Sequence, residues 1–404
     1  METSSRTQDD APAAELHVRA VPGLARIPAA EWDRCATSPE TLAAGDETFN
    51  PFVSHAFLSA LEESGCVSRK TGWLPLHVTV ERAGRLVGAA PCYLKSHSQG
   101  EYVFDQGWAD AIERAGGAYY PKLQVSVPFT PVTGPRFLIA PGEEPDAAAA
   151  AIVAGLRALR AETEASSIHV TFMREREWDQ AGALGLLQRI DQQFHWENRG
   201  YSTFEDFLGD LASRKRKAIK RERREALGCG ITIEHVTGSE ITEAHWDAFF
   251  EFYVDTGARK WGRPYLNKTF FRLIGERMPE RILLVMARRE GRLIAGAINF
   301  IGDVALYGRN WGCVEDHPFL HFEVCYYQAI EFALANGLKR VEAGAQGEHK
   351  LARGYRPVAM HSAHDIAELS LRRAVAGYLE RERGYVQAAM DEYATMTPFR
   401  ACDE

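Results

Sequence analysis

Two stretches of the chain share a pattern that constrains the fold more than any other feature of the sequence. Residues 76–91 (LHVTVERAGRLVGAAP) and 283–298 (LLVMARREGRLIAGAI) each predict a strand, a turn and a second strand. The turns contain Gly84 and Gly291, and glycine supplies the positive φ that such hairpins need. In both parts of the chain a further extended segment, a helix and another strand follow. These helices are expected at 147–162 and 321–338, and these strands at 167–172 and 339–343. The repeated order predicts an α/β protein of two similar tandem domains with mixed central sheets, which arose by duplication.

The length and the ends of the chain suggest how it is divided. Its 404 residues are enough for two or three domains of about 150 residues each. We expect a disordered tail at 1–14, an N-terminal domain at 15–198, a basic linking helix within 199–228 and a C-terminal domain at 229–404. The tail is polar and lacks the basic start and apolar core of a secretion signal. No apolar run approaches the roughly 18 residues of a membrane helix, so we expect a cytoplasmic protein without a membrane span.

Charge and cysteine content argue against several classes of protein. The formal net charge of −8 disfavours nucleic-acid binding through overall charge, although a local basic patch is compatible with it. The seven cysteines show no C-x-x-C spacing and their number is odd. This indicates reduced thiols, and neither a disulfide framework nor a zinc site. We expect no metal site and no tightly bound cofactor.

The loop that follows the strand 339–343 collects polar side chains within five positions. Gln346, Glu348, His349 and Lys350 come directly after Gly344. In α/β proteins, ligands usually bind where strands end in this way. Glu342 or His349 is a candidate general base, because an imidazole titrates near neutral pH and a partly desolvated carboxylate is tuned toward it. The alternatives are a strand carboxylate paired with a neighbouring cation and a histidine that caps a turn.

Several other residues near this loop are candidates for binding substrate. Tyr307, Arg309 and Trp311 alternate along one predicted strand, so they are expected on one face, where an Arg between two rings can hold an anion. Lys350 and Arg353 are candidates for an anionic donor or acceptor, or are solvated charges. His321 and Glu323 lie at the start of the predicted helix 321–338, which precedes the loop, and polar residues at such a place more often cap the helix than bind metal.

In the first half, four polar residues stand in otherwise apolar motifs. They are Asn50, His55, Asp105 and Lys122. Two interpretations are open: they line a groove for the acceptor, or they bind buried backbone groups.

The segment between the two halves is strongly basic. Arg214, Lys217, Arg221 and Arg224 share one face of a predicted helix. This face is either a solvated surface paired with acidic neighbours or a dock for phosphates, such as those of a nucleotide or an RNA backbone.

Taken together, these motifs resemble a known family, the FemAB-like branch of the GNAT N-acyltransferases. The matching stretches are 50–58, 100–105, 119–123, 127–135, 214–217, 306–309, 320–327 and 342–350. The resemblance implies two GNAT-like domains and transfer of an acyl group to the amine of a small molecule or peptide, by direct attack in a ternary complex. It implies acyl-CoA as co-substrate or, alternatively, aminoacyl-tRNA with a peptidoglycan-type peptide as acceptor.

Further expectations concern the donor, a non-catalytic alternative and the number of active sites. The usual GNAT phosphate loop, Arg/Gln-x-x-Gly-x-Gly/Ala, is not evident in either half, which favours the tRNA alternative. A non-catalytic protein that binds precursor or RNA on the same scaffold is the third alternative. We expect one active site, mainly in the second half, with the first half completing the acceptor cleft.

Overall fold

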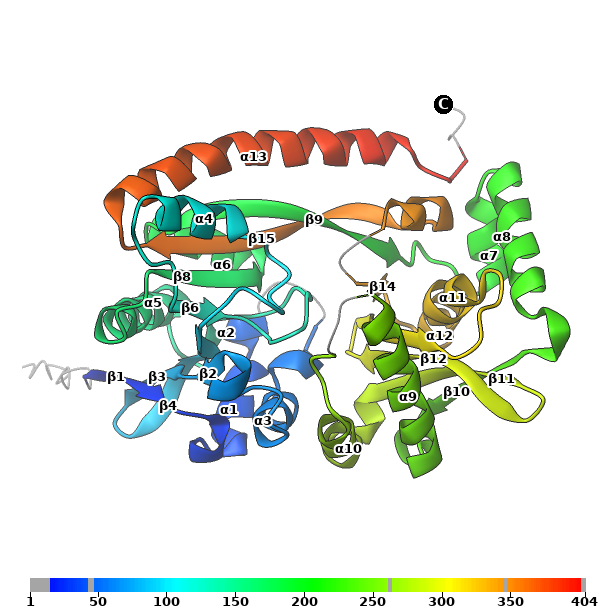
Figure 1. The fold of residues 1–404 in the computed structure, drawn as a ribbon, viewed down its shortest axis with the longest axis horizontal. Coiled ribbons are helices and arrows are strands. Elements are labelled where there is room, and N and C mark those ends of the chain that lie inside the picture. The colour runs from blue at the N-terminus through cyan, green and yellow to red at the C-terminus, as the bar shows by residue number, and fades with distance from the viewer. Residues whose placement is uncertain (1–14, 43–46, 261–263, 345–346, 401–404) are drawn as a thin grey trace, which may run out of the picture.

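The computed structural model describes residues 15–42, 47–260, 264–344 and 347–400, and its strands form two sheets (Figure 1). The smaller sheet has the order β1-β3-β4-β7, and the larger has the order β10-β11-β12-β13-β14-β9-β15-β8-β6-β5-β2. The strands are β1 Leu16–Val21, β2 Trp73–Pro75, β3 His77–Arg82, β4 Arg85–Ala90, β5 Cys92–Lys95, β6 Lys122–Val125, β7 Leu138–Ile139, β8 Ser167–Met173, β9 Leu187–Glu197, β10 Thr232–Thr237, β11 Ile282–Arg289, β12 Arg292–Ile301, β13 Ala305–Cys313, β14 Arg340–Glu342 and β15 Arg356–Ile366.

Helices cover both faces of these sheets. They are α1 Ala29–Ala36, α2 Pro39–Leu42, α3 His55–Glu63, α4 Gln106–Arg114, α5 Pro145–Glu162, α6 Glu175–Ala183, α7 Phe204–Asp210, α8 Ser213–Ala226, α9 Glu243–Lys260, α10 Lys268–Arg277, α11 Leu320–Phe322, α12 Gln328–Ala335 and α13 Leu369–Thr395. A π-helical segment, Glu323–Tyr327, joins α11 to α12. Among the described helices none is long and apolar enough to cross a membrane.

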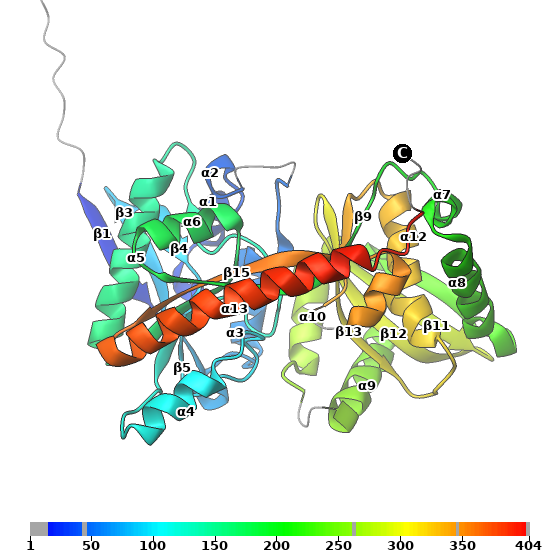
Figure 2. The same ribbon diagram turned by 90° about the horizontal axis from the view of Figure 1, so that it is seen from above.

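The two halves of the chain share the larger sheet. β9 pairs with β14 of the second half, and β15, from near the C-terminus, lies between β8 and β9. Helix α13 packs along β9 and β15 and extends lengthwise over both halves (Figure 2). The limits 15–198 and 229–404 stay a prediction, because one sheet runs across them.

The predicted duplication is visible in the strand pairing. Each half contains one parallel pair, β6 with β8 and β13 with β14, among otherwise antiparallel neighbours. In each half a helix connects the members of the pair, α5 in the first and the α11–α12 segment in the second. The prediction of an α/β fold with mixed sheets is therefore confirmed.

A bulge in β13 changes which side chains share a face. Asn299 pairs with Gly308 and Ile298 with Asn310, so Arg309 is an extra residue in β13. Tyr307 is consequently buried in one hydrophobic core, whereas Trp311 packs against another. The prediction that Tyr307, Arg309 and Trp311 share one face is wrong, because the bulge shifts the alternation between them.

An aromatic core joins the two halves directly. Phe52 of the first half lies 5.0 Å from Phe300 and 5.2 Å from Tyr307 of the second, measured between ring centroids. Phe57 lies 5.6 Å from Phe270 in the same way. Such ring pairs add roughly 1 kcal/mol each to the burial of their surfaces. The position of one half relative to the other is therefore set by packing.

Candidate active site between the two halves

The strands β13 and β14 separate after a short region of pairing. Their parallel pairing begins where Ala305 faces Arg340 and ends where Tyr307 faces Glu342. Beyond this point β13 continues to Cys313, whereas β14 ends and Gly344 takes a positive φ of 76°. β12 pairs with this part of β13 on one side, and on the other side the described residues contain no strand of the larger sheet beyond Tyr307. The branch point is therefore the place where no described strand pairs with the β14 side of β13.

The corresponding branch point of the first half is filled by its own chain. The amide of Gly134 donates to the carbonyl of Phe172 at 3.0 Å, so the loop after β6 occupies the edge of β8. The buried Arg136 side chain donates to the carbonyls of Thr171 and Val132, both at 2.8 Å. This packing supports a single site in the second half.

A cavity of about 860 Å³ lies between the halves beside β9, β14 and β15. Its lining combines acidic, basic and imidazole side chains. These include Glu47, Arg174, His195, Arg340 and Glu342. The mixture suits a polar ligand that carries charges of both signs.

Glu342 lies both at the branch point and in the cavity wall. It is the last residue of β14, and only 2% of its surface is exposed. Its Oε1 accepts a hydrogen bond of 2.8 Å from Arg340 Nε, whereas its Oε2 has no hydrogen-bond partner. A buried carboxylate oxygen without a partner is costly, and it indicates a place for a donor group such as an amine.

His195 was missed by the sequence reasoning. It pairs with Glu342 across β9 and β14, and its Nε2, also without a hydrogen-bond partner, lies 3.7 Å from Glu342 Oε2. Burial lowers the pKa of His195, although the nearby Glu342 opposes this shift. Nothing in the local sequence marks this residue, because the contact arises from pairing between strands about 150 residues apart.

Glu47 and Arg174, also missed, extend the polar wall from the first half. Tyr307 Oη donates to Glu47 Oε1 at 2.8 Å, and Arg174 forms an ion pair with the same carboxylate. Tyr307 itself is fully buried, so its ring is not available for stacking on a substrate.

The side chains of the loop after β14 do not converge on one point. His349 is exposed and its Nε2 lies 2.9 Å from Tyr326 Oη, while Glu348 accepts a bond of 2.5 Å from Tyr393 of α13. No hydrogen bond or ion pair joins the two described candidate bases, Glu342 and His349. Gln346 lies outside the described residues.

Lys350 is buried rather than solvated. Its Nζ donates to the carbonyl of Gly344 at 2.8 Å and so ties the two ends of the loop together. Burial lowers the pKa of Lys350 to about 7, although the nearby Cys325 opposes this shift and Arg309 adds to it. At pH values between about 7 and 10.5, Lys350 is protonated in the unfolded chain and neutral in the folded chain. Lys350 therefore destabilises the fold below its folded pKa, and this cost disappears as the pH rises toward 10.5.

We expect Lys350→Met to raise the free energy of unfolding at pH 7 by roughly 2 kcal/mol, after the lost hydrogen bond is counted. The gain should shrink at pH 9.5, because the wild-type protein then bears only the smaller part of the cost. Urea unfolding at both pH values measures this, with the exposed Lys70→Met as control. A gain of equal size at both values, or no gain, would contradict the expectation.

Arg353, His321 and Glu323 belong to the wall behind the loop. Arg353 donates to the carbonyl of His349 at 2.7 Å and to Glu222 of α8 at 2.9 Å, and it lies 3.5 Å from the ring centroid of Phe322. Glu323 is fully buried and binds Arg223 and Gln328. Within the described residues no group of three or more His, Cys, Asp or Glu could hold a metal ion.

An aromatic patch borders the branch point on the second half. We use this name for Trp311, His321, Phe322 and His349, which are exposed or half-buried. The ring centroids of Trp311 and His321 are 5.2 Å apart, and those of Phe322 and His349 are 5.6 Å apart. The π-helical segment follows directly, and such segments are frequent at functional sites. The patch offers flat surfaces on which a planar group can stack.

In the first half, two of the four candidate polar residues bind backbone groups. The side chain of Asn50 accepts from the amide of Phe52 at 3.1 Å, and His55 Nε2 lies 3.2 Å from the carbonyls of Leu24 and Ile27. His55 also lines a second cavity of about 590 Å³. These contacts agree with the second interpretation for Asn50 and His55.

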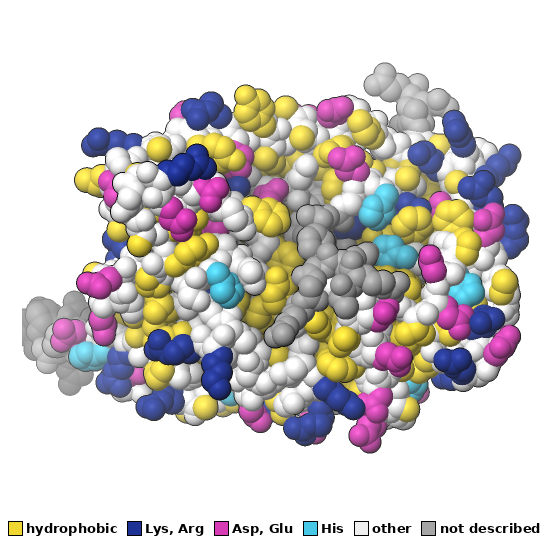
Figure 3. All heavy atoms as spheres, in the orientation of Figure 1, with side chains coloured by type: hydrophobic (Ala, Val, Ile, Leu, Met, Phe, Trp, Pro, Cys, Tyr) yellow, Lys and Arg dark blue, Asp and Glu magenta, His cyan; other side chains and the backbone are white. Residues whose placement is uncertain are grey.

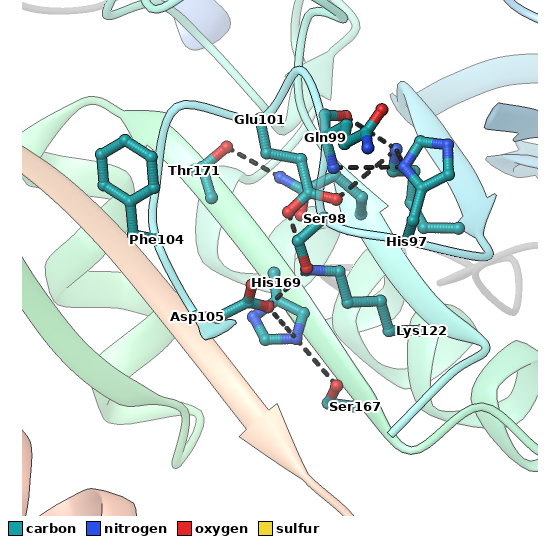
Figure 4. A network of polar contacts seen from close by, with 12 residues as sticks. His97, Ser98, Gln99, Glu101, Phe104, Asp105, Lys122, Ser167, His169 and Thr171 are labelled. Atoms are coloured by element: carbon teal, nitrogen blue, oxygen red, sulfur yellow. Dashed lines mark hydrogen bonds and ion pairs between the residues drawn. The ribbon is translucent and has the colours of Figure 1, made fainter. Parts of the chain in front are cut away.

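Asp105 and Lys122 belong to a buried ionic network (Figure 4). Lys122 Nζ donates to Glu101 at 2.7 Å and to Ser98 at 2.8 Å, and it forms an ion pair with Asp105. Figure 4 shows that Glu101 and Asp105 reach Lys122 from the loop that passes over β6. The network therefore holds this loop against the sheet.

The linking segment 199–228 contains two helices, α7 and α8. Lys and Arg side chains gather at the end of the molecule where α8 lies (Figure 3). The four predicted dock residues, Arg214, Lys217, Arg221 and Arg224, are all exposed. Arg221 Nε lies 3.6 Å from Glu225 Oε1, whereas the side chains of the other three residues form no ion pair with any described residue. Arg223 instead turns inward and binds Glu323 and Glu331.

Comparison with solved structures identifies the class of fold. The crystal structure of FemX is similar with a TM-score of 0.51 at 12% identity, over 87% of this chain and 99% of that chain. A tandem GNAT protein from the clavulanic acid biosynthesis pathway reaches 0.47 at 12% identity, over 88% of this chain and 99% of its own. The structure of L-PGS from Bacillus licheniformis reaches 0.48 at 9% identity, over 83% and 98%. The chain shares the fold of FemX, with two GNAT-like domains in tandem as predicted.

The family follows from the sequence as a whole. A model of the FemAB-like family, described as peptidoglycan biosynthesis/recognition, matches residues 23–401. The chain belongs to this family, and the resemblance indicated by its motifs is confirmed. It is a transferase, and the family assigns it to acyl or aminoacyl transfer in peptidoglycan biosynthesis. No curated protein matches the chain.

Proposed function

We propose that the protein transfers an aminoacyl group from a tRNA ester to an amine of a peptide-bearing acceptor, which binds in the cavity between the halves. The amine attacks the ester carbonyl directly, without a covalent enzyme intermediate. The single observation that carries this proposal is the place of Glu342. Among the described candidate bases it alone both lines the cavity and ends the strand at the branch point.

The chemistry follows from this geometry. An acceptor amine arrives as an ammonium ion, and the free Oε2 of Glu342 accepts a hydrogen bond from it. Loss of a proton makes the nitrogen a nucleophile. The donor carbonyl lies at the unpaired edge of β13, whose backbone amides stabilise the tetrahedral oxyanion. Lys350 supports the same site by holding the loop end at Gly344.

The absence of a GNAT phosphate loop before α11 favours tRNA over acyl-CoA as donor. The segment before α11, where a GNAT phosphate loop is expected, carries Glu315 and Asp316. Glu315 binds Arg289 and His317, and α11 itself has only three residues. The segment between Trp311 and His321 lacks the Gly-x-Gly/Ala run of a GNAT phosphate loop, which supports tRNA over CoA as donor.

The aromatic patch and α8 together suit the end of an RNA strand. Arg353 contacts both, because it covers the ring of Phe322 and binds Glu222 of α8. Unpaired bases stack on exposed rings while nearby cations contact the phosphates. The exposed cations of α8 then serve as the predicted dock.

Acyl-CoA remains the second candidate donor, because the branch point accepts a thioester carbonyl as readily as an ester. Calorimetric titration with acetyl-CoA, longer acyl-CoAs and an aminoacyl-tRNA analogue distinguishes the two donors. Micromolar binding of an acyl-CoA without tRNA binding would reverse our choice of donor. Binding of a peptidoglycan peptide without turnover from either donor would favour the non-catalytic alternative.

We expect the combined variant Arg214→Ala, Lys217→Ala and Arg224→Ala to weaken tRNA binding and to reduce its salt dependence. Each lost phosphate contact removes roughly 0.7 to 0.9 from the slope of log K against log salt, so the slope should fall by about 2. Titrations at several salt concentrations measure this. The control is a matched triple change of exposed cations in the first half, Arg69→Ala, Lys70→Ala and Arg85→Ala. An equal loss in the control would show that α8 is no specific dock.

A further inference from the structure

The facing atoms of His195 and Glu342 are an unusual feature of the buried cavity wall. Their exposed fractions are 5% and 2%, and both residues line the cavity. His195 Nε2 and Glu342 Oε2 lie 3.7 Å apart, and neither has a hydrogen-bond partner. Leaving two such buried atoms without a hydrogen bond in one place costs free energy on folding. A ligand that bonds both atoms removes this cost.

The spacing fits one nitrogen atom between the two groups. A separation of 3.7 Å is too long for a direct hydrogen bond. A nitrogen placed off the line between them reaches both at about 2.9 Å, the usual length of such bonds. An ammonium group supplies one proton to each acceptor and keeps a third for a further partner.

We propose that His195 is the base that takes the proton from the acceptor amine, while Glu342 holds the ammonium ion and then the imidazolium ion. This inference rests on the proposed function and divides between two residues the role that Glu342 alone would otherwise fill.

The surrounding charges support this division. Arg340 donates to Glu342 Oε1, so this carboxylate already has one cationic partner, and its Oε2 is the atom that faces His195. Burial favours the neutral imidazole of His195, and the charges of Arg340 and Lys350 act in the same direction. Glu342 and Glu197 oppose them. A neutral imidazole is therefore present at neutral pH to accept a proton, and the adjacent carboxylate stabilises the resulting cation.

The proton and electron balance is complete with the groups already named. The ammonium ion gives one proton to His195 Nε2, and its nitrogen regains a lone pair. That pair forms the C–N bond to the donor carbonyl, and the carbonyl π electrons move to oxygen. When the oxyanion collapses, the bond from carbon to the ribose oxygen breaks. The leaving oxygen takes one proton from the imidazolium, and the product amide nitrogen loses its extra proton to solvent.

Turnover measurements test the role of His195 through its pH dependence and its rescue. We expect His195→Ala to lower kcat about 100-fold to 1,000-fold and to remove the rise of activity with pH that reports a neutral imidazole. Added imidazole should restore part of the rate. The control His235→Ala, on the outer strand β10, should leave both the rate and the pH profile unchanged. A reduced rate with an unaltered pH profile and no rescue would overturn the proposal, since it would show a structural role.

An NMR titration tests the same inference without any turnover. The probe is n-butylammonium ion, and n-butanol is the neutral control. We expect the amine, and not the alcohol, to shift the ring signals of His195 in the wild-type protein, with a weaker effect in Glu342→Gln. Unmoved His195 signals at saturating amine would refute the amine site. If the titration succeeds while no donor and acceptor pair turns over, the proposed function fails and the amine site stands.

Discussion

Glu342→Gln should lower kcat/KM by about 1,000-fold while leaving the affinity for the donor unchanged. The amide keeps the shape of the side chain and its place at the end of β14, but it removes the negative charge beside His195. General acid–base and electrostatic groups of this kind typically contribute factors of 100 to 10,000. Steady-state kinetics with saturating aminoacyl donor, together with calorimetric binding of that donor, measures the two quantities separately.

The matched control is Glu234→Gln, a glutamate on the strand β10 whose partner is Arg288. It tests whether the loss of a strand glutamate in itself reduces activity. Urea unfolding of both variants guards against loss of the fold. A Glu342→Gln enzyme that keeps most of its kcat/KM would remove Glu342 from the chemistry and leave His195 and His349 as the candidate bases.

The site was predictable from the sequence where it depends on local order. The run of helix, strand and glycine before residue 344 located the end of a central strand, and Glu342 was proposed on that ground. In the structure the pairing of β13 with β14 ends at Glu342, which places this residue at the branch point. Periodicity along a single strand was less reliable, because an extra residue at Arg309 has no signature in the sequence.

Contacts between the halves were not predictable in the same way. His195 faces Glu342 only because β9 crosses to the second half and pairs with β14. Arg174 and Glu47 reach the cavity from segments whose composition is ordinary for a helix start and a loop. Register between distant strands is set by the packing of the whole sheet, and one sequence alone does not reveal it. The loop side chains were predicted to act together, but His349 and Glu348 have partners of their own.

The role of Lys122 was also not predictable from the sequence alone. A lysine within an apolar motif suggests either a ligand contact or a buried partner, and the sequence left both open. The structure places its Nζ among Glu101, Asp105 and Ser98 with no exposed surface. Lys95 is the second cation of this network, and its Nζ lies 3.6 Å from Glu101. The network holds the loop over β6. In that loop the carbonyl of Gly100 accepts a hydrogen bond of 3.1 Å from the backbone amide of Phe129. The backbone carbonyl of Phe129 accepts a hydrogen bond of 2.8 Å from the side chain of Arg309 at the branch point.

Lys122→Met is therefore expected to be the most destabilising single change considered, with a loss of about 3–5 kcal/mol in the free energy of unfolding at pH 7.5. Methionine fills much of the space, but Glu101 and Asp105 then share only Lys95 as a cation. Breaking a buried ion pair costs this much because the remaining charge stays desolvated. The exposed pair of Lys268 and Asp247 gives the control, and Lys268→Met should change stability much less than Lys122→Met does.

The pH dependence of this loss distinguishes charge from packing. Burial raises the pKa of Asp105, but the charge of Lys122 outweighs this and holds it below its usual value. Without Lys122 the buried carboxyl groups bind protons more readily in the folded state than in the unfolded state. The deficit of the variant should therefore shrink as the pH falls from 7.5 to 5, and adding Asp105→Asn should recover part of it at pH 7.5. Urea unfolding at the two pH values measures both effects. A deficit that is independent of pH, with no recovery in the double variant, would assign the loss to the shape of the side chain and leave the ionic network without a role in stability.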